Sequence, residues 1–302
     1  MMKKKYTRKV KGQMLFYACL LAIPLLQFTV FYIYVNINSI AMAFQNYDVR
    51  EGFTFAGFEN FSKIFDQIKT DSIFRGAIWN TLLVFVLGLA IGTTVPVLVS
   101  YYIYKKQPFF SLFRVLLFLP SIISSLVLVL AYKYFMEVAV PQIWLDCFGK
   151  TVEGLLSNTE TDFFFVLFFT YWFGMGSTFL LYVTSMCSIS DAIVESAKLD
   201  GFTPLQEFWY ITFPLVYPTY VTFVVVNIST LFTNQINLFS IFSNYAPDSM
   251  YTIGYWMYKE TARATIGGYP YLAAMGILCT VIAVPTCLGI KYLLEKFGPS
   301  VE

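Results

Sequence analysis

The sequence predicts an all-α integral membrane protein with six transmembrane helices and a polar helical loop between the fourth and the fifth. Of its 302 residues, 58% are hydrophobic and 13% are charged, whereas a soluble domain carries about 25% charged residues. Many of the 32 Phe, 22 Tyr and 5 Trp lie near the ends of apolar runs, as in an interfacial aromatic belt. The chain therefore has too few polar residues to cover itself in water.

Six apolar runs are long enough to cross a bilayer, which takes about 20 helical residues. None of them carries Asp, Glu, Lys or Arg in its middle, and Arg114, Lys133 and Lys291 lie near ends, where long side chains can reach the interface. The first run is too long for a cleaved signal peptide, so we expect an uncleaved first span. The predicted spans lie near residues 13–35, 78–103, 112–135, 163–184, 216–241 and 270–293.

Basic residues set the expected orientation, because they favour the cytoplasmic side. They lie at the start of the chain, in the second connection, in the loop between the fourth and fifth spans, which we also expect to be cytoplasmic, and near the end: Lys3, Lys4, Lys5, Arg8, Lys9, Lys11, Lys105, Lys106, Arg114, Lys198, Lys291 and Lys296. We therefore expect a cytoplasmic N-terminal tail (1–12), one membrane domain (13–295) and a cytoplasmic C-terminal tail (296–302). The largest outer segment, 36–77, is expected to fold and, with 136–162 and 242–269, could receive a partner.

The sequence offers no set of residues for catalysis or for a metal site. It has no histidine, which removes the usual proton shuttle, and its five cysteines show no paired spacing. The residues Gly149-Lys150-Thr151 do not end a phosphate-binding loop, because position 144 is Trp144. We expect a transport protein that is not an enzyme, binds no cofactor itself and has no nucleic-acid partner.

Residues 188–218, here called loop 188–218, read as two short helices between apolar runs. Gly201 lies at the expected bend. Thr203 can cap the second helix, with Pro204 at its first position and Gln206 completing a capping box. We expect this second helix to end by Pro214, because proline lacks the backbone donor and clashes with the preceding turn.

The spacing in this loop resembles the EAA loop of ABC importer permeases. Glu195-Ser196-Ala197 is followed after three residues by Gly201, and after nine more by Ile211-Thr212-Phe213-Pro214. Ser196 replaces an alanine of that pattern and Phe213 replaces a leucine. Asp200-Gly201 followed by Phe208 is similar to the carbohydrate branch, the permeases of the maltose, multiple-sugar and glycerol-phosphate type. The resemblance extends from about residue 14 to residue 295, although Ser243–Pro247 departs from the Gly-Gly-Pro turn of many relatives.

The resemblance implies a permease subunit in the plasma membrane of a bacterium, coupled through loop 188–218 to two cytoplasmic ATPases that use ATP and Mg. It also implies a second, related permease and an extracellular solute-binding protein. In this interpretation Glu195 is a polar anchor, Gly201 allows the bend, Ile211 is an apolar knob and Pro214 fixes the exit into span five. The other coupling positions are Ser196, Ala197, Asp200 and Phe208. The alternative is a helical hairpin that rests on the membrane without a partner.

Polar side chains in the fifth predicted span mark a candidate substrate path. At about 100° per residue, Asn227, Thr230, Asn234 and Asn237 fall on one stripe of a helix. Amides donate and accept hydrogen bonds and so suit sugar hydroxyls, but they also join helices to one another in membranes, and both interpretations stay open. Aromatic rings that could stack on a sugar are Tyr171, Trp172, Phe232 and Tyr182.

The expected substrate is a carbohydrate, preferably an oligosaccharide. Ion-coupled carriers keep ionisable groups inside the membrane, and the predicted spans have none at mid-depth, so the energy should come from another subunit. Three alternatives remain: an ABC permease for another polar solute such as glycerol phosphate, a stand-alone secondary carrier, and a membrane-embedded enzyme. The sequence leaves the sugar and its length open.

Overall fold

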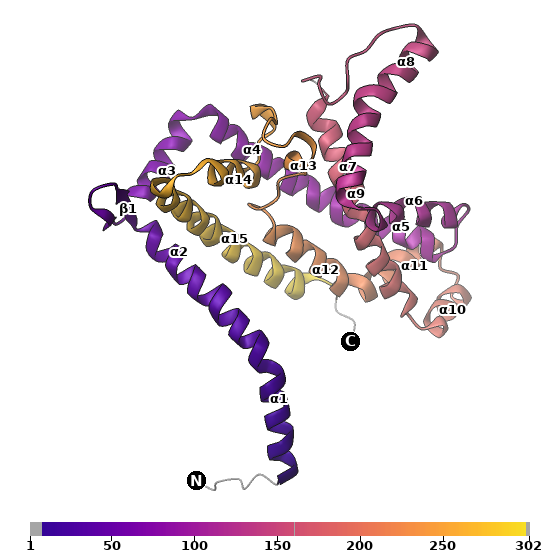
Figure 1. Ribbon diagram of the computed structural model, residues 1–302. Helices are drawn as coiled ribbons and strands as arrows, with labels where there is room; N and C mark the ends of the chain where they lie inside the picture. Colours follow the sequence, from indigo (N-terminus) through magenta and orange to yellow (C-terminus); the bar gives the residue numbers. More distant parts are fainter. Residues whose placement is uncertain (1–7, 160, 300–302) are drawn as a thin grey trace. The chain divides into compact units, whose positions relative to one another are not determined.

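The computed structural model describes residues 8–159 and 161–299, and almost all of its regular structure is helical (Figure 1). Six helices are long and apolar enough to span a membrane: Gly12–Ala43, Ser72–Tyr104, Ser125–Phe148, Asp162–Cys187, Pro204–Ser229 and Ile266–Phe297. The predicted fold class and the number of spans are confirmed. Residues 1–7 of the predicted N-terminal tail, with Lys3, Lys4 and Lys5, and residues 300–302 of the predicted C-terminal tail lie outside the described residues.

Residues 1–66 and 263–278 form one compact unit, of which the structure describes the part from Arg8 onward. Helix α1 (Arg8–Gln27) continues through a π-helical turn (Phe28–Tyr34) into α2 (Val35–Ala43). An antiparallel hairpin follows, with β1 (Gln45–Asp48) paired to β2 (Gly52–Phe55) so that Gln45 faces Phe55. The buried Asn60 joins helix to hairpin, because its Nδ2 donates to the carbonyls of Ala43 (3.0 Å) and Gln45 (2.8 Å).

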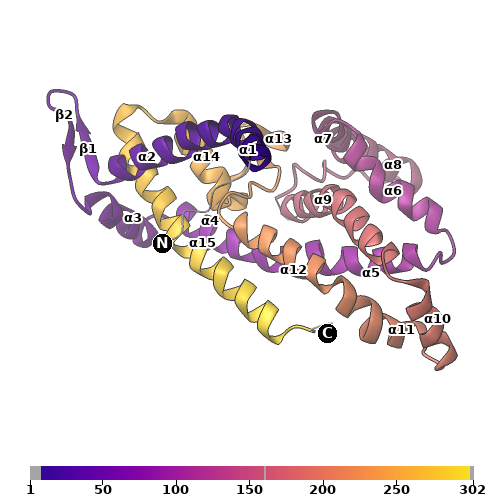
Figure 2. The same cartoon turned by 90° about the horizontal axis from the view of Figure 1, so that it is seen from below.

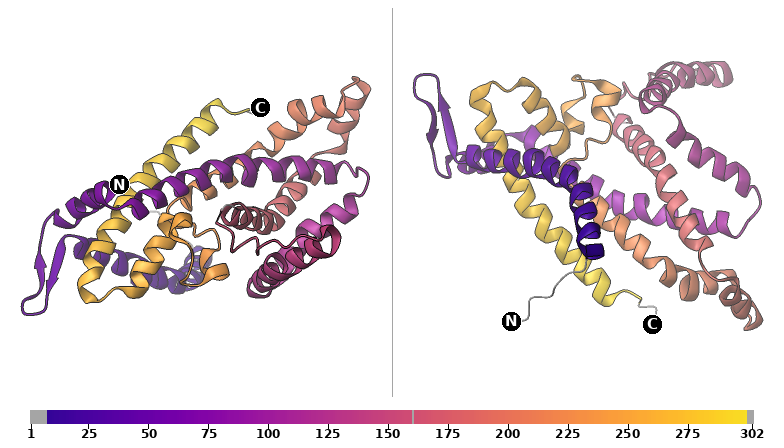
Figure 3. Two further views of the ribbon diagram at one scale, coloured as in Figure 1. Left: turned by 90° about the horizontal axis from the view of Figure 1, so that it is seen from above. Right: turned by 60° about the horizontal axis from the view of Figure 1, so that its bottom comes forward.

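The second unit holds residues 67–262 and 279–302, as far as they are described. Helix α3 (Glu59–Thr70) leads into it, and the Asp71 carboxylate caps α4 (Ser72–Leu87) by accepting from the backbone N–H groups of Ile73 and Phe74. A π-helical turn (Gly88–Thr93) connects α4 to α5 (Thr94–Tyr104), and Figure 3 shows the two as one long helix. The long helix α9 (Asp162–Cys187) packs against both α5 and α6 (Figure 2).

The prediction of one continuous third span over 112–135 is wrong. The chain forms α6 (Phe110–Ile122), leaves the helix at Ile123 and Ser124, and resumes as α7 (Ser125–Tyr134), a π-helical turn (Phe135–Ala139) and α8 (Val140–Phe148). Pro120 removes a backbone donor from the last turn of α6. Ile123 is extended, and the Ser124 carbonyl accepts from the N–H of Leu128, which starts the next helix.

The prediction of a fifth span over 216–241 is also wrong at both ends, as is the expected helix end at Pro214. Helix α11 (Pro204–Glu207) passes through a π-helical turn (Phe208–Thr212) into α12 (Phe213–Ser229), so one helical path includes Pro214 and Pro218. A π-helical turn lies directly before Pro214, so the path departs from regular α-helical bonding at the place where proline lacks a backbone donor. Beyond Ser229 the chain is irregular up to α13 (Leu238–Phe242).

Two further helices complete the chain, α14 (Ile253–Arg263) and α15 (Tyr269–Phe297). One core cluster of the second unit, here called the core cluster, consists of Val97, Tyr182, Met186, Phe208 and Val216. These side chains come from α5, α9, the π-helical turn before α12, and α12. Their packing therefore attaches loop 188–218 to the spans that lead into it, out of it and alongside it.

Candidate functional site

Loop 188–218 folds as the local sequence predicts on both sides of its bend. Helix α10 (Asp191–Leu199) is followed by Asp200 and then by Gly201, whose φ of +79° is the left-handed conformation that glycine adopts without strain. The Phe202 N–H then donates to the Ala197 carbonyl (3.1 Å). Thr203 and Gln206 form the predicted capping box: the Gln206 N–H donates to Thr203 Oγ1 (3.4 Å), and the Thr203 N–H donates to Gln206 Oε1 (2.9 Å). The result is a short elbow of two helices.

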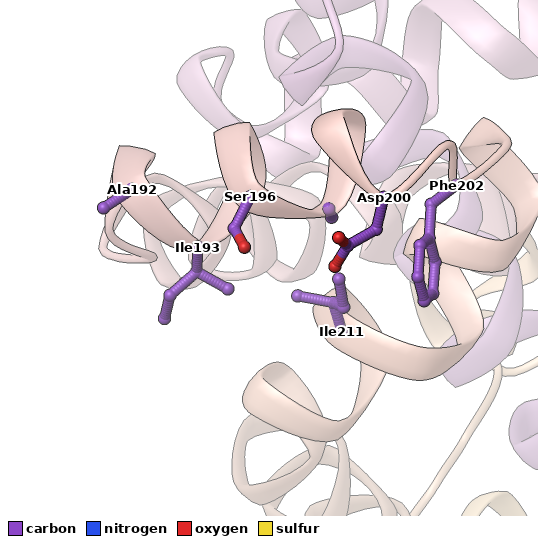
Figure 4. A pocket seen from close by; sticks show the side chains of 7 residues that line it. Ala192, Ile193, Ser196, Asp200, Phe202 and Ile211 are labelled. Atoms are coloured by element: carbon purple, nitrogen blue, oxygen red, sulfur yellow. The ribbon is translucent and has the colours of Figure 1, made fainter.

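The inner side of this elbow is a hollow of about 370 Å³. Figure 4 shows the Asp200 carboxylate pointing toward Ile211 across it, with the Phe202 ring on one side and Ser196 on the other. Four of the eight predicted coupling positions therefore come together here: Ser196, Ala197, Asp200 and Ile211. Glu195 is exposed on α10 and does not line the hollow. The bend at Gly201 is what places Ile211 opposite α10.

The remaining predicted coupling positions hold the loop in place. Phe208 is buried in the core cluster, where its ring lies 4.9 Å from that of Tyr101. Pro214 is half-buried at the start of α12. These two positions therefore fix the elbow on the spans, while α10 faces outward.

Exposed apolar side chains on the elbow are functional candidates that the sequence analysis did not single out. Leu199 is 88% exposed, Tyr210 73% and Leu205 68%. Large apolar groups gathered on a loop that also carries Glu195, Lys198 and Asp200 are typical of a surface that a partner covers. The available signal was the presence of Leu199 between two charged residues, a position where a solvated helix face favours a polar side chain.

A second feature that sequence reasoning missed is the buried ion pair between Lys105 Nζ and Glu207 Oε1. Glu207 lies in the first turn of a helix, where an acidic residue is usually explained by the helix dipole and by solvation. Lys105 follows α5 in a connection that reads as an ordinary basic cytoplasmic turn. Neither position alone indicated a buried contact.

The predicted substrate path is only partly assembled. Residues 230–240 enclose a hollow of about 420 Å³, and three members of the predicted stripe line it, Thr230, Asn234 and Asn237. They do so from irregular backbone, so the helical stripe itself is wrong. The fourth member, Asn227, lies on α12 away from the hollow and packs against the bare backbone of Gly88, where an added Cβ would meet Asn227 Nδ2 at 2.5 Å.

Side chains from other elements hold this segment, here called segment 230–237. Thr170 Oγ1 donates to the Ile236 carbonyl (3.0 Å) and accepts from Asn237 Nδ2 (3.2 Å). On the other side, Thr252 Oγ1 donates to the Asn234 carbonyl (2.8 Å). Ile236 and Asn237 both have positive φ, which ends any helical path here. The amide of Asn237 thus joins elements, and a side-chain amide still has further hydrogen-bonding capacity.

The predicted aromatic residues do not gather at this hollow. The Tyr171 hydroxyl donates to the Val84 carbonyl (2.8 Å) across to span two, and Tyr182 is fully buried in the core cluster. Trp172 packs beside Phe169, with ring centroids 6.3 Å apart. Phe232 is half-buried next to the hollow in sequence but does not line it. Tyr171 and Tyr182 therefore have packing roles in this structure.

The hairpin and the residues after it in the first unit present exposed aromatic side chains. Phe55 on β2 and Phe58 beyond it are exposed, and the Phe58 ring packs against Phe44 and Phe61. The nearby Glu59 carboxylate accepts from Lys63 Nζ (2.9 Å) and from Asn46 Nδ2 (2.8 Å), and the Lys63 contact lowers the pKa of Glu59. This segment is folded, as the sequence predicted, and combines apolar and charged groups on its surface.

Comparison with known proteins places these features in a family. Residues 85–302 match the family of the binding-protein-dependent transport system inner membrane component. The chain is 26% identical over 280 residues to the multiple sugar-binding transport system permease protein of Streptococcus mutans, covering 92% of this chain and 94% of the relative. It is also 26% identical over 280 residues to the arabinooligosaccharides transport system permease protein of Halalkalibacterium halodurans, covering 90% and 85%.

A solved structure has the same fold over nearly the whole chain. It is the crystal structure of a bacterial alginate ABC transporter in complex with an alginate pentasaccharide-bound periplasmic protein. One chain of it superposes with a TM-score of 0.77 at 23% sequence identity, covering 97% of this chain and 99% of that one. At this identity the likeness concerns the fold.

Proposed function

The chain belongs to the family of the binding-protein-dependent transport system inner membrane component, which its residues 85–302 match, and we therefore propose that it is a permease subunit of an ATP-driven importer of carbohydrates. The inference that the substrate is a carbohydrate is supported by the similarity, over about nine tenths of the chain, to permeases named for multiple sugars and for arabinooligosaccharides. An oligosaccharide is the substrate class that we favour.

Loop 188–218 is the proposed attachment point for the ATPase subunits. Its elbow is stiffened by the capping box and by the buried Phe208, while Leu199 and Leu205 stay exposed. A stiff, partly apolar projection can transmit the closure of a partner into the membrane spans. In the proposal two ATPase subunits bind and hydrolyse Mg·ATP, and this chain contributes no cofactor site.

The translocation path is proposed to pass segment 230–237, at the end of α12. Thr230, Asn234 and Asn237 offer hydroxyl and amide groups there, which match the hydroxyls of a sugar. A related second permease would supply the facing half of the path. A solute-binding protein would deliver the sugar to the outer segments, and the spans would then alternate between outward and inward access.

The test is to purify the tagged chain from its native membranes in mild detergent and to identify its companions by mass spectrometry. Recovery of an ATPase, a second six-span protein and a solute-binding lipoprotein is the expected result. The lipoprotein is then screened against neutral and acidic oligosaccharides and glycerol phosphate to name the substrate. Recovery of this chain alone at good yield, with uptake that survives ATP depletion, would overturn the proposal in favour of a secondary carrier.

A further inference from the structure

Loop 188–218 is joined through the backbone to spans four and five, and the structure adds a buried link to span two. The Lys105 ammonium, directly after α5, contacts the Glu207 carboxylate in α11. The two side chains are only 15% and 5% exposed. Charges withdrawn from water to this extent need each other, since removal of one partner leaves an uncompensated charge.

Further contacts join the same two elements. The Tyr101 hydroxyl donates to the Pro204 carbonyl (2.7 Å), which lies at the first position of α11. The Tyr101 ring also packs on Phe208, and Lys105 Nζ lies over the rings of Tyr101 and Tyr104 at 5.7 and 5.5 Å from their centroids. One turn earlier on α5, Val97 belongs to the core cluster with Phe208. The contacts thus run along more than one turn of α5.

We propose that Lys105 and Glu207, supported by Tyr101, form a latch that makes span two move together with loop 188–218. Lys105 and Glu207 are positioning residues for transport: they bind neither sugar nor nucleotide, and they pass the displacement of the loop to a span that the backbone does not connect to it. Span two continues through the π-helical turn at Gly88, against which Asn227 of span five packs. The latch therefore acts at the cytoplasmic end of a helix that contacts span five again at its middle.

The chain contains a matched control for the chemistry of the pair. Lys291 and Glu295 form an ion pair of 3.7 Å within one helix, with side chains 49% and 58% exposed. The variant Glu295→Gln removes the same type of charge contact, but both partners lie in one helix, so no contact between two elements is lost. Any effect of Glu207→Gln that Glu295→Gln also shows is a general effect of charge.

A double-mutant cycle tests whether the pair is a latch in the folded protein. Glu207→Gln and Lys105→Met are expected to lower the thermal unfolding midpoint of the purified tagged chain, with whatever subunits copurify, by about 5 °C each. Their double variant should lose less than the sum, and the exchanged pair Lys105→Glu with Glu207→Lys should recover most of the loss. Glu295→Gln should leave the midpoint unchanged. Additive losses without recovery in the exchanged pair would overturn the contact. This measurement needs no substrate or nucleotide, so it stays decisive even if the proposed function fails.

The transmission step rests on the proposed function and is tested by distances in the assembled importer. Spin labels are placed at Gln107→Cys and at Ser190→Cys, an exposed position directly before α10, in a chain whose five native cysteines are replaced. With the latch intact, the label distance should be the same with Mg·ADP and with a non-hydrolysable ATP analogue. In Glu207→Gln the distance should change between the two nucleotides, and the exchanged pair should restore a constant value. The transmission step would be overturned if the label distance already changed between the two nucleotides with the latch intact, or if it stayed constant in Glu207→Gln.

Discussion

Loop 188–218 and segment 230–237 lie at opposite ends of the helical path from Pro204 to Ser229, and they reach their shapes by different means. The loop is shaped by neighbours in sequence: Gly201 makes the bend and Thr203 pairs with Gln206 three residues on. Segment 230–237 is held by Thr170 on α9 and by Thr252, which lies directly before α14. A locally determined structure can be displaced as one stiff body, whereas a structure held by its surroundings changes when those surroundings shift. That difference fits a lever at one end and a path at the other.

The strongest test of the lever is Gly201→Pro. Proline fixes φ near −65° and removes the N–H that donates to the Lys198 carbonyl, so the bend at +79° is lost at a local cost of about 3 kcal/mol. Uptake of the identified sugar should fall to background while membrane insertion stays normal. Gly149→Pro is the matched control, because Gly149 also ends a helix with positive φ and donates to a carbonyl, that of Leu145. If both variants lost uptake equally, the loss in Gly201→Pro would not be specific to this bend, and the proposed role of the bend in coupling would be contradicted.

The exposed apolar surface of the lever is tested by Leu199→Asp combined with Leu205→Asp. Both side chains are largely exposed in this chain, so the fold should tolerate the change, whereas a partner that covers them should lose about 2 kcal/mol, or roughly 30-fold in affinity. The measurement is the amount of ATPase that copurifies with the tagged chain. Tyr245→Asp, at another highly exposed aromatic position, serves as control. Full ATPase recovery with the double variant would remove these leucines from the docking surface.

The surroundings of segment 230–237 are tested by Gly254→Ala on α14. An added Cβ would lie 2.8 Å from the Asn234 carbonyl oxygen and 2.7 Å from the Thr233 carbonyl carbon, and backbone atoms cannot rotate away. We expect a loss of about 2 kcal/mol in the free energy of unfolding, because the segment must shift. Thermal unfolding of the purified complex measures it. Gly76→Ala on α4, where a Cβ meets nothing within 4 Å, should be neutral or slightly stabilising.

The smallest expected effect separates the two roles of Asn237. Asn237→Ala loses the hydrogen bond to Thr170 and places alanine at a φ of +57°, with an expected cost of about 1 kcal/mol. Asn237→Gly loses the same bond but accepts the backbone conformation. If the amide also binds sugar, both variants should raise the KM for uptake several-fold, although the alanine variant should be the less stable of the two. An unchanged KM in both variants would limit Asn237 to a packing role.

The sequence predicted those parts of the molecule whose causes are local. The six spans, the bend at Gly201 and the capping box follow from composition, periodicity and residues within one turn of each other. The broken third span and the end of the fifth at Ser229 were missed, because an apolar run with helical period does not show where distant side chains take over the backbone. The four-residue stripe failed for that reason, since Asn234 and Asn237 lie on irregular backbone.

The ion pair between Lys105 and Glu207 could not be predicted for a related reason. Each residue has an ordinary explanation in its own sequence neighbourhood, and only the packing of α5 beside α11 brings the two charges together and buries them. The exposed leucines of the elbow, by contrast, carried a readable signal, because they interrupt a polar helix face.

The π-helical turns within the spans determine how the α-helical segments before and after each turn are rotated relative to one another. Among the described residues, π-helical turns occur at Phe28–Tyr34, Gly88–Thr93, Phe135–Ala139 and Phe208–Thr212. Such a turn holds one residue more than the α-helix around it, and one α-helical residue corresponds to about 100° of rotation. Deletion of one residue from the turn at Phe208–Thr212 would allow regular α-helical hydrogen bonds through this region. It would also rotate the faces of α12 relative to the elbow. The additional residue in the turn thus determines which face each half of the helix presents to its neighbours.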